Sequence, residues 1–317
     1  MMRNDVLSVA VDALGGTVDQ GGLAALDVAV GAMTTYRVGG CADIFVSVRN
    51  RADLKRVAVA AAESELPLLV VGRGSNLLIA DAGFRGIALS ISDLPELLEV
   101  DQVQATVAAS AGLLLPVVAR RSAAAGLTGF EWAVGVPGSI GGAVRMNAGG
   151  HGSDIASSLV SVVVFDLGAG VAAGEEAILA SDLGLRFRGS DLSSNVVVLE
   201  ARLQLATGDQ AAAERQISEI VGWRRENQPG GQNAGSVFVN PVPGEVSAGA
   251  LIDDAGLRGL RVGSASVSEK HANFIQADAG GSADDVRDLM RVVRSRVEES
   301  SGYALRSEIR LIGFADE

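Results

Sequence analysis

Glycine is the residue that most restricts how this chain can fold. The segment GVPGSIGGAVRMNAGGHGSD, residues 135–154, places seven glycines among twenty residues, and Pro137 fixes its entry. A stretch with so few side chains adds little packing volume, but its backbone can lie close against a flat or phosphorylated ligand. Forty of the 317 residues are glycine, about 13% against a usual ~7%, and they follow no period, which excludes a collagen-like chain.

A second glycine loop lies in VVGRGSNLLIA, residues 70–80. A dinucleotide fingerprint would need a third glycine where Leu77 stands, and a helix where apolar, β-like residues follow. A glycine loop between two strands can instead present several backbone amides to a diphosphate, although a tight hairpin explains the same residues. Two separated loops of this kind predict a large, extended cofactor.

Composition narrows the class of protein. Hydrophobic residues make up 48% and charged residues 20%, and 38 acidic against 26 basic residues give a net charge of -12, which disfavours a nucleic-acid partner. Cys41 is the single cysteine and there are two histidines, so we expect no disulfide framework and no metal site. Without an apolar run of about 18 residues, and with Asp5 and Asp12 near the N-terminus, we expect a cytoplasmic protein without membrane insertion. The oligomeric state stays open.

Hydrophobic periodicity predicts the main elements. Apolar residues at helical spacing indicate helices at 51–65, 113–125, 212–227 and 282–300. Ser282 is placed to cap the last of these helices. Strand-like patterns occupy 158–166, 195–205 and 304–314. A composition shift near 206–209 marks a domain boundary, and residues 1–30 read as a short extension with one helix.

Three polar residues stand out, each with a plain structural alternative. Ser236, in QNAGSVFVNP (232–241), follows a glycine and precedes a short apolar run. Taken alone, a turn serine that hydrogen-bonds its own backbone is the usual explanation of such a pattern. Arg188, in LRFRGSD, could simply pair with Asp191. Glu308 shares a strand face with Arg310 and could pair with Arg310 or Arg306 in solvent.

The ordered motifs of this chain resemble one family, the UDP-N-acetylenolpyruvoylglucosamine reductases, also called UDP-N-acetylmuramate dehydrogenases. The chain looks like the shorter subclass, which lacks a tyrosine-bearing insertion. The matching motifs span about residues 31–314 and are TTYRVGGCAD (34–43), VVGRGSNLL (70–78), GFEWAVGVPGSIGGAVRMNAGGHG (129–152), GSVFVNP (235–241), AGALIDDAGLRGLRVGSASVSEKHANF (248–274) and SEIRLIG (307–313).

The resemblance implies an α+β protein with an N-terminal extension (1–30) and an FAD-binding domain of the PCMH/vanillyl-alcohol-oxidase type (31–207). A smaller α/β substrate-binding domain (208–317) follows, with a C-terminal strand returning to the active site. The implied activity is reduction of UDP-N-acetylglucosamine enolpyruvate to UDP-N-acetylmuramate in peptidoglycan precursor synthesis, with NADPH as hydride donor and non-covalent FAD. Alternatives are another FAD oxidoreductase of the same fold, or a catalytically idle nucleotide-sugar-binding protein.

The resemblance also implies the site residues. Ser236 would protonate the substrate carbon as general acid, while Arg188 and Glu308 would polarise its carboxylate. Weaker candidates for substrate contact are Asn240, Lys270, His271 and Arg310, and a capping or core histidine explains His271 equally. The residues expected to contact FAD are Tyr36, Arg37, Gly39, Gly72, Arg73, Gly74, Ser75, Asn76, Leu77, Gly135, Pro137, Gly138, Ser139, Gly141, Gly142 and Asn147.

Three positions depart from the family pattern. Phe187 stands where a tyrosine usually precedes the catalytic arginine, so a hydroxyl contact is lost. Val239 replaces a common lysine, and His151 replaces a frequent aromatic residue in the glycine loop. None of these changes touches Arg188, Ser236 or Glu308, so activity is expected, with a possible change in nucleotide affinity.

Overall fold

The computed structural model describes residues 3–315, which form two compact units. Each unit is built from several separate stretches of the chain. Among the described residues, the first unit comprises 3–27, 43–73 and 86–224, and the second comprises 28–42, 74–85 and 225–315. The mixed α+β class is confirmed, whereas the domain boundaries read from the sequence stay a prediction.

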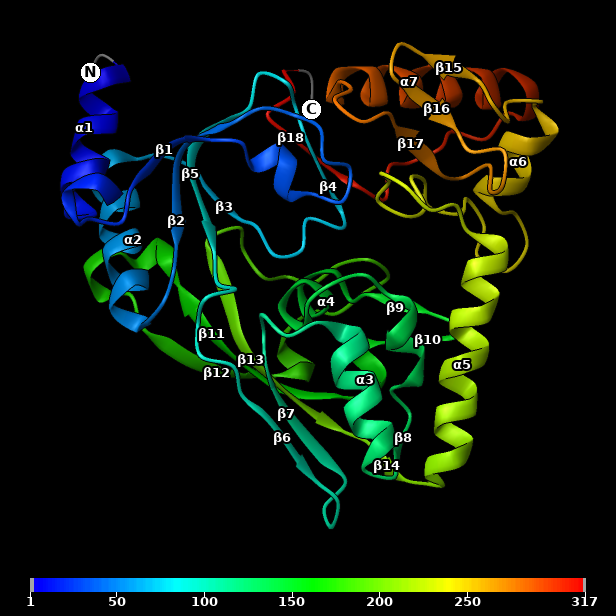
Figure 1. The fold of residues 1–317 in the computed structure, drawn as a ribbon, viewed down its shortest axis with the longest axis horizontal. Helices are drawn as coiled ribbons and strands as arrows, with labels where there is room; N and C mark the ends of the chain where they lie inside the picture. Colours follow the sequence, from blue (N-terminus) through cyan, green and yellow to red (C-terminus); the bar gives the residue numbers. More distant parts are fainter. Residues whose placement is uncertain (1–2, 316–317) are drawn as a thin grey trace. The chain divides into compact units, whose positions relative to one another are not determined.

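A five-stranded antiparallel sheet forms the centre of the first unit (Figure 1). Its strand order is β12-β11-β13-β7-β6. Inward-facing residues such as Val162 and Val164 on β11 are buried, and two register shifts interrupt the pairing of β11 with β13. The predicted strands at 158–166 and 195–205 are confirmed. The strands are β6 (Leu98–Asp101), β7 (Thr106–Ser110), β11 (Leu159–Asp166), β12 (Glu175–Leu179) and β13 (Val196–Gln204).

A smaller sheet has the order β1-β2-β5-β3, and β3 runs parallel to β5. Helix α2 begins after Asn50, whose side chain accepts a hydrogen bond from the Asp53 amide at 3.1 Å. Helix α1 packs against α2, as Figure 1 shows. The elements are α1 (Arg3–Ala13), β1 (Ala25–Val28), β2 (Ala42–Ser47), α2 (Arg51–Ser64), β3 (Leu68–Val70) and β5 (Phe84–Ser90).

The helices expected at 51–65, 113–125 and 212–227 are confirmed as α2, α3 and α5. One short helix, α4, was not predicted, because three of the nine residues from Gly138 to Met146 are glycine. The remaining elements are η1 (Val18–Gln20), α3 (Leu115–Ala124), β8 (Leu127–Thr128), η3 (Glu131–Gly135), α4 (Ile140–Met146), β9 (Gly149–Gly150), β10 (Ser153–Asp154), η4 (Ile155–Ser157), η5 (Leu167–Ala172), η6 (Ala180–Asp182), β14 (Ala206–Thr207) and α5 (Gln210–Asn227).

The second unit has its own core beneath α7, whose apolar stripe packs on a three-stranded antiparallel sheet, β15-β16-β17. Ser282 caps α7 by accepting from the Asp285 amide at 3.1 Å, as predicted. No helix within residues 3–315 combines the length and apolar character needed to cross a bilayer. The elements are η2 (Val30–Met33), β4 (Leu77–Ile79), α6 (Ala248–Asp254), β15 (Arg261–Val262), β16 (Ala265–Val267), β17 (Ile275–Ala277), α7 (Ala283–Ser301) and β18 (Arg310–Ile312).

Strands β4 and β18 lie side by side in parallel, with Leu78 opposite Leu311 (Figure 1). The predicted strand at 304–314 is thus shorter than expected, because only three of its residues pair regularly. This pairing joins the second half of the 70–80 loop to the end of the chain.

Candidate active site

In the first unit, parts of both glycine loops line one pocket. Gly72 and Ser139 meet there, since a Cβ added to Gly72 would lie 3.0 Å from the Ser139 hydroxyl oxygen. The space, including its open mouth, is about 560 Å³. The lining comprises Val70, Gly72, Arg73, Ile91, Ser92, Ala111, Gly112, Ser139, Gly141, Gly142, Arg145 and Val196, Val197 and Val198.

Helix α4 forms one wall of this pocket and corrects one expectation. Its glycines do not only open space for a ligand: a Cβ on Gly141 would come 2.9 Å from that of Ala111, so this glycine lets α4 approach β7 closely. Ile140, Ala143 and Val144 are buried, so the segment does pack into the core. The glycine loop therefore combines a tight helix contact with an open face.

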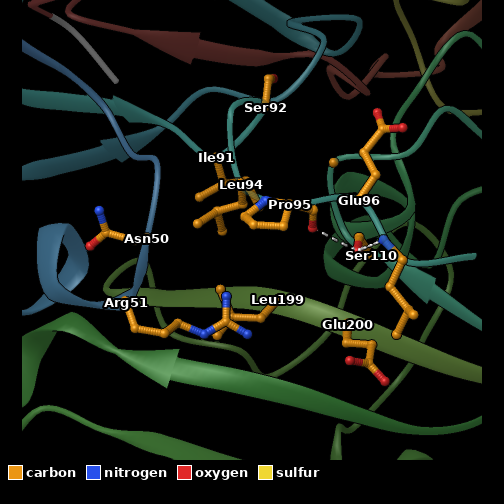
Figure 2. Close-up of a pocket in the computed structure, with 12 residues that line it drawn as sticks. Asn50, Arg51, Ile91, Ser92, Leu94, Pro95, Glu96, Ser110, Leu199 and Glu200 are labelled. Carbon is orange, nitrogen blue, oxygen red and sulfur yellow. Dashed lines mark hydrogen bonds between the residues drawn. The ribbon is translucent and has the colours of Figure 1, made fainter.

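A second pocket adjoins the first and shares Ile91, Ser92 and Gly112 with it. Figure 2 shows Asn50 and Arg51 on one side of this space, with Glu96 and Glu200 on the other. Ser110 fixes the neighbouring loop, since its hydroxyl oxygen accepts from the Leu97 amide at 2.7 Å. The two pockets therefore share part of one wall.

The 74–77 turn belongs to the second unit and is built on residues 33–35. Gly74 has φ +60°, and a Cβ there would lie 2.5 Å from the Thr34 Cα atom. Its carbonyl accepts from the Thr35 amide at 3.2 Å. Only glycine fits such a backbone, so this position is fixed by the fold as well as by any cofactor.

Asn76 and Leu77 connect this turn to the end of the chain. The Asn76 side-chain amide donates to the Glu308 carbonyl at 3.2 Å, and the Asn76 carbonyl accepts from the Arg310 amide at 3.0 Å. Leu77 then starts β4 and pairs with Arg310. Ser75, between Gly74 and Asn76, lies in the turn itself and is partly exposed.

The segment that contains Tyr36, Arg37 and Gly39 lies against β4. The Tyr36 ring is fully buried in the core of the second unit, and this burial raises the pKa of its hydroxyl, with the Ala234 backbone opposing the shift. Arg37 has a left-handed backbone, φ +55°. A Cβ on Gly39 would lie 2.1 Å from the Ile79 carbonyl oxygen. Tyr36 is buried as a whole residue, so its contact with a cofactor stays a prediction.

The structure brings the Ser236 and Glu308 segments together within the second unit. The carbonyl of Val237, the residue after Ser236, accepts a hydrogen bond from the Glu308 amide at 2.8 Å. The Val237 amide donates to the Asn273 carbonyl at 2.9 Å. Ser236 itself forms a β-bridge with Phe274. Ser236 and Glu308 are therefore held on adjacent stretches of backbone, and both are partly exposed.

Buried Asn273 fixes the Ser236 segment further. Its side-chain oxygen accepts from the Phe238 amide at 3.0 Å and its side-chain nitrogen donates to the Phe238 carbonyl at 2.8 Å. Asn273 is 4% exposed. Its side-chain amide supplies the two hydrogen bonds that the backbone of a neighbouring strand would otherwise make with Phe238. The HANF motif (271–274) contains Asn273, but the sequence analysis did not predict this structural role.

Arg188 lies in the first unit, in a tight turn closed by paired backbone hydrogen bonds between Arg186 and Gly189. Its φ is +56°, a left-handed value that is uncommon outside glycine, and its guanidinium carbon lies 5.1 Å from the Phe187 ring centroid. Asp191 pairs with Arg186, not with Arg188 as the structural alternative assumed.

Helix α4 is flanked in the sequence by Gly135, Pro137 and Gly138 on one side and Asn147 on the other. A Cβ on Gly135 would lie 3.1 Å from the His151 ring, and Gly138 accepts from the Leu115 amide at 3.0 Å. Asn147 ends α4 with φ +39° and is 4% exposed, with its side-chain amide bonded to protein groups on both atoms. Its contact with FAD stays a prediction and would involve its backbone.

The four substrate candidates have structural partners in the second unit. Asn240 accepts from the Ala248 amide at 3.0 Å and so helps to begin α6. Lys270 donates to the carbonyl of Arg225 at 2.6 Å. His271 lies 4.7 Å from the Phe274 ring, centroid to centroid. Arg310 starts β18. These contacts leave the substrate roles as predictions.

Comparison with known proteins supplies the family. Residues 42–171 match the model described as FAD binding domain, and residues 227–312 match UDP-N-acetylenolpyruvoylglucosamine reductase, C-terminal domain. The enzyme of that name from Heliobacterium modesticaldum is 41% identical over 282 residues, 88% of each chain. The Gloeobacter violaceus enzyme is 41% identical over 292 residues, covering 90% of this chain and 95% of its own.

This chain belongs to the UDP-N-acetylenolpyruvoylglucosamine reductase family. A crystal structure of the Thermus caldophilus reductase agrees, with a TM-score of 0.76 and 35% identity over 91% of this chain and 99% of the other. The resemblance stated from the motifs is confirmed, as are the flavoprotein class and an FAD-binding domain ahead of a family-specific C-terminal domain. The individual site residues stay predictions.

The pocket between the glycine loops fits the FAD of a UDP-N-acetylenolpyruvoylglucosamine reductase. Side chains at Gly72 or Gly142 would project towards the Ser139 hydroxyl, so glycine keeps this space free for a ligand. Sequence reasoning missed other lining residues of the two pockets, among them Ser92, Ser110 and Arg145. Ser110 precedes Ala111-Gly112 at the end of β7, and this small-residue run was the available signal.

Proposed function

We propose that this protein reduces the enolpyruvyl group of UDP-N-acetylglucosamine enolpyruvate to give UDP-N-acetylmuramate, with NADPH as hydride donor. This reaction belongs to peptidoglycan precursor synthesis, and we expect it in the cytoplasm. One observation carries the proposal: the family match covers both halves of the chain, and the hydroxyl and carboxyl it requires lie on adjacent backbone segments, joined by the Glu308 amide and the Val237 carbonyl at 2.8 Å.

Bound FAD supplies the relay of hydride between NADPH and the enolpyruvyl double bond. Gly72, Ser139, Gly141 and Gly142 would hold it in the first unit, since they line the pocket where the two loops meet. Close backbone approach at these positions lets main-chain amides contact a phosphorylated ligand. We infer that the cofactor is held without a covalent bond.

The chain's own contribution is to stabilise charge on the substrate. Adding hydride to the terminal vinyl carbon pushes negative charge onto the carbon beside the carboxylate, and from there onto the carboxylate oxygens. Arg188, as a cation, and Glu308, as a proton-bearing carboxyl, would polarise this carboxylate in our proposal. One preorganised donor of this kind contributes about 3 kcal/mol to the transition state.

Ser236 would complete the reaction by giving its hydroxyl proton to the carbon beside the carboxylate. A neutral serine is a weak acid, so it can protonate only a strongly basic carbanion or enol. Precise placement matters for such a group, and the Phe274 bridge and the Asn273 hydrogen bonds hold its backbone on one side. Gly235, with φ +77°, turns the chain immediately before it.

Ser236→Ala tests this function when the two half-reactions are followed separately by flavin absorbance. NADPH should still reduce the flavin, whereas reoxidation by the enolpyruvyl substrate should slow by about 10²–10⁴-fold. Ser295→Ala is the control, because Ser295 is an exposed serine of the same unit that bonds to Glu299 on α7. Unchanged reoxidation in Ser236→Ala would remove Ser236 from its role. A wild-type flavoprotein that never uses this substrate would favour another oxidoreductase of the same fold.

A further inference from the structure

The turn that carries Arg188 is tied to the end of helix α4. The side-chain nitrogen of Asn147 donates to the Arg186 carbonyl at 3.2 Å and to the Asp154 carboxylate at 3.1 Å. Its side-chain oxygen accepts from the Ala156 amide at 3.0 Å. One buried amide therefore joins the Arg188 turn, the end of α4 and the 153–157 segment.

Arg145, in the last turn of α4, holds the other side of the same loop. Its guanidinium donates to the carbonyls of Ser193 at 3.0 Å and Val196 at 3.4 Å. In the opposite direction, the Ser190 hydroxyl donates to the Arg145 carbonyl at 2.8 Å. The loop from 186 to 196 is thus bonded to α4 on both sides of Arg188.

The turn needs such support because its own conformation is unfavourable. A left-handed backbone costs a non-glycine residue about 1–2 kcal/mol, and Arg188 adopts one with φ +56°. The Arg186–Asp191 ion pair shapes the loop but is well exposed, and such pairs stabilise little. Strained residues persist when their surroundings over-determine them, and here the hydrogen bonds to α4, most of them partly buried, belong to those surroundings.

We propose that Asn147 and Arg145 are positioning residues for Arg188. Helix α4 begins with Ser139, Gly141 and Gly142, which line the cofactor pocket, and ends with the residues that hold the Arg188 turn. The helix therefore sets the guanidinium relative to the pocket through a short, rigid connection. This inference rests on the proposed role of Arg188 in the reductase reaction.

The first test follows the two half-reactions in FAD-loaded Asn147→Ala. Reoxidation of the reduced flavin by the enolpyruvyl substrate should slow ~10–100-fold, while reduction by NADPH changes less than ~3-fold, because only the former uses Arg188. In an Arg188→Ala background the same change should cost less than ~3-fold, since the two residues act as one unit. Equal slowing of both half-reactions, or full additivity with Arg188→Ala, would overturn the inference.

Ser153→Ala is the matched control, because its surface hydroxyl pairs with that of Ser157 in the segment that Asn147 also contacts. Neither half-reaction should change in it. Ser190→Ala is the second variant, for the case that Asn147→Ala fails to fold. It removes the hydrogen bond from the Ser190 hydroxyl to the Arg145 carbonyl. Reoxidation of the flavin should then slow ~3–10-fold, with NADPH-driven reduction little changed. Normal reoxidation in Ser190→Ala together with an unfolded Asn147→Ala would count against positioning.

Hydrogen exchange gives a readout that does not depend on the reaction. Amides in peptides covering residues 184–196 should exchange ~10-fold faster in Asn147→Ala or Ser190→Ala than in wild type or Ser153→Ala. Unchanged exchange would show that these hydrogen bonds do not hold the turn. Should wild-type protein fail to use the enolpyruvyl substrate, the proposed function falls, and this measurement still decides whether the tethers exist.

Discussion

The Asn76 side chain donates to the backbone carbonyl of Glu308 at 3.2 Å, across 232 residues of sequence. In the other unit, the Asn147 side chain donates to the Arg186 carbonyl at the same 3.2 Å. Each glycine loop thus carries an asparagine whose amide bonds to the backbone of a segment bearing a proposed catalytic residue. In our proposal the loops have two roles: their glycines make room for a ligand, and their asparagines fix the neighbouring segment.

Asn76→Ala should slow enolpyruvyl reduction, because it removes the side-chain hydrogen bond that fixes the Glu308 backbone. We expect a fall in kcat of ~10-fold and a loss of ~1 kcal/mol in the free energy of unfolding. Steady-state kinetics with the enolpyruvyl substrate and thermal unfolding measure the two effects. Asn4→Ala, at an exposed position on α1, should change neither, and a normal kcat in Asn76→Ala would show that this bond is dispensable.

Two glycine-to-alanine changes should have opposite effects on stability. Gly74→Ala places a Cβ 2.5 Å from the Thr34 Cα atom at φ +60°, so we expect a loss of ~2 kcal/mol or more and weaker FAD retention. Gly222→Ala lies within α5 with nothing near its added Cβ, and should gain ~0.5–1 kcal/mol. Thermal unfolding compares them. A neutral Gly74→Ala would contradict the close approach seen here.

His271 should make stability depend on pH. Burial, and secondarily the charge of Arg258, lowers the pKa of His271, while its own backbone opposes the shift. The folded protein therefore favours the neutral ring, so this contribution is present above about pH 6.5 and is lost as pH falls through the lowered pKa. His271→Gln should show a smaller drop in Tm than wild type between about pH 7.5 and about pH 5.5. An identical drop in both proteins would exclude His271 as the source.

Phe187 should help to order the Arg188 side chain. The guanidinium carbon lies 5.1 Å from the ring centroid, and a cation–π contact at a partly exposed site contributes about 0.5–1 kcal/mol. Phe187→Leu should therefore slow reoxidation of the reduced flavin by about 2–5-fold, with NADPH-driven reduction unchanged. Phe187→Tyr keeps the ring and should retain the wild-type rate at least. A Leu variant as fast as wild type would mean that the ring contact is incidental.

The long periodic elements could be predicted from the sequence. Helix α7 shows why: Ser282 caps it, and its apolar residues repeat at helical spacing over nineteen residues. The three-residue strand β18 was expected to be longer, since pairing with a distant partner, not local propensity, sets its limits. Helix α4 was missed because Gly141 and Gly142 are poor helix formers, and the close contact with Ala111 that favours glycine depends on tertiary structure.

The candidate site was accessible mainly through motifs. Ser236 and Glu308 could be named in advance, but the hydrogen bond between Val237 and Glu308 that brings their segments together joins parts of the chain far apart in sequence. Asn273 and Arg145 could not be found in this way, since nothing in their local sequence distinguishes a buried asparagine or a loop-holding arginine from an exposed one. Such roles follow from geometry.

The pairing of β4 with β18 has a consequence for how the protein is made. Strand β4 is synthesised long before its partner, β18, because the two strands lie far apart in the sequence. During translation, Asn76 and β4 lack their partner segment until β18 has been synthesised. A nascent chain arrested before residue 310 would therefore expose the unpaired edge of β4. Completion of the second unit, and with it the placement of the Glu308 segment, therefore requires that the chain has been synthesised through β18.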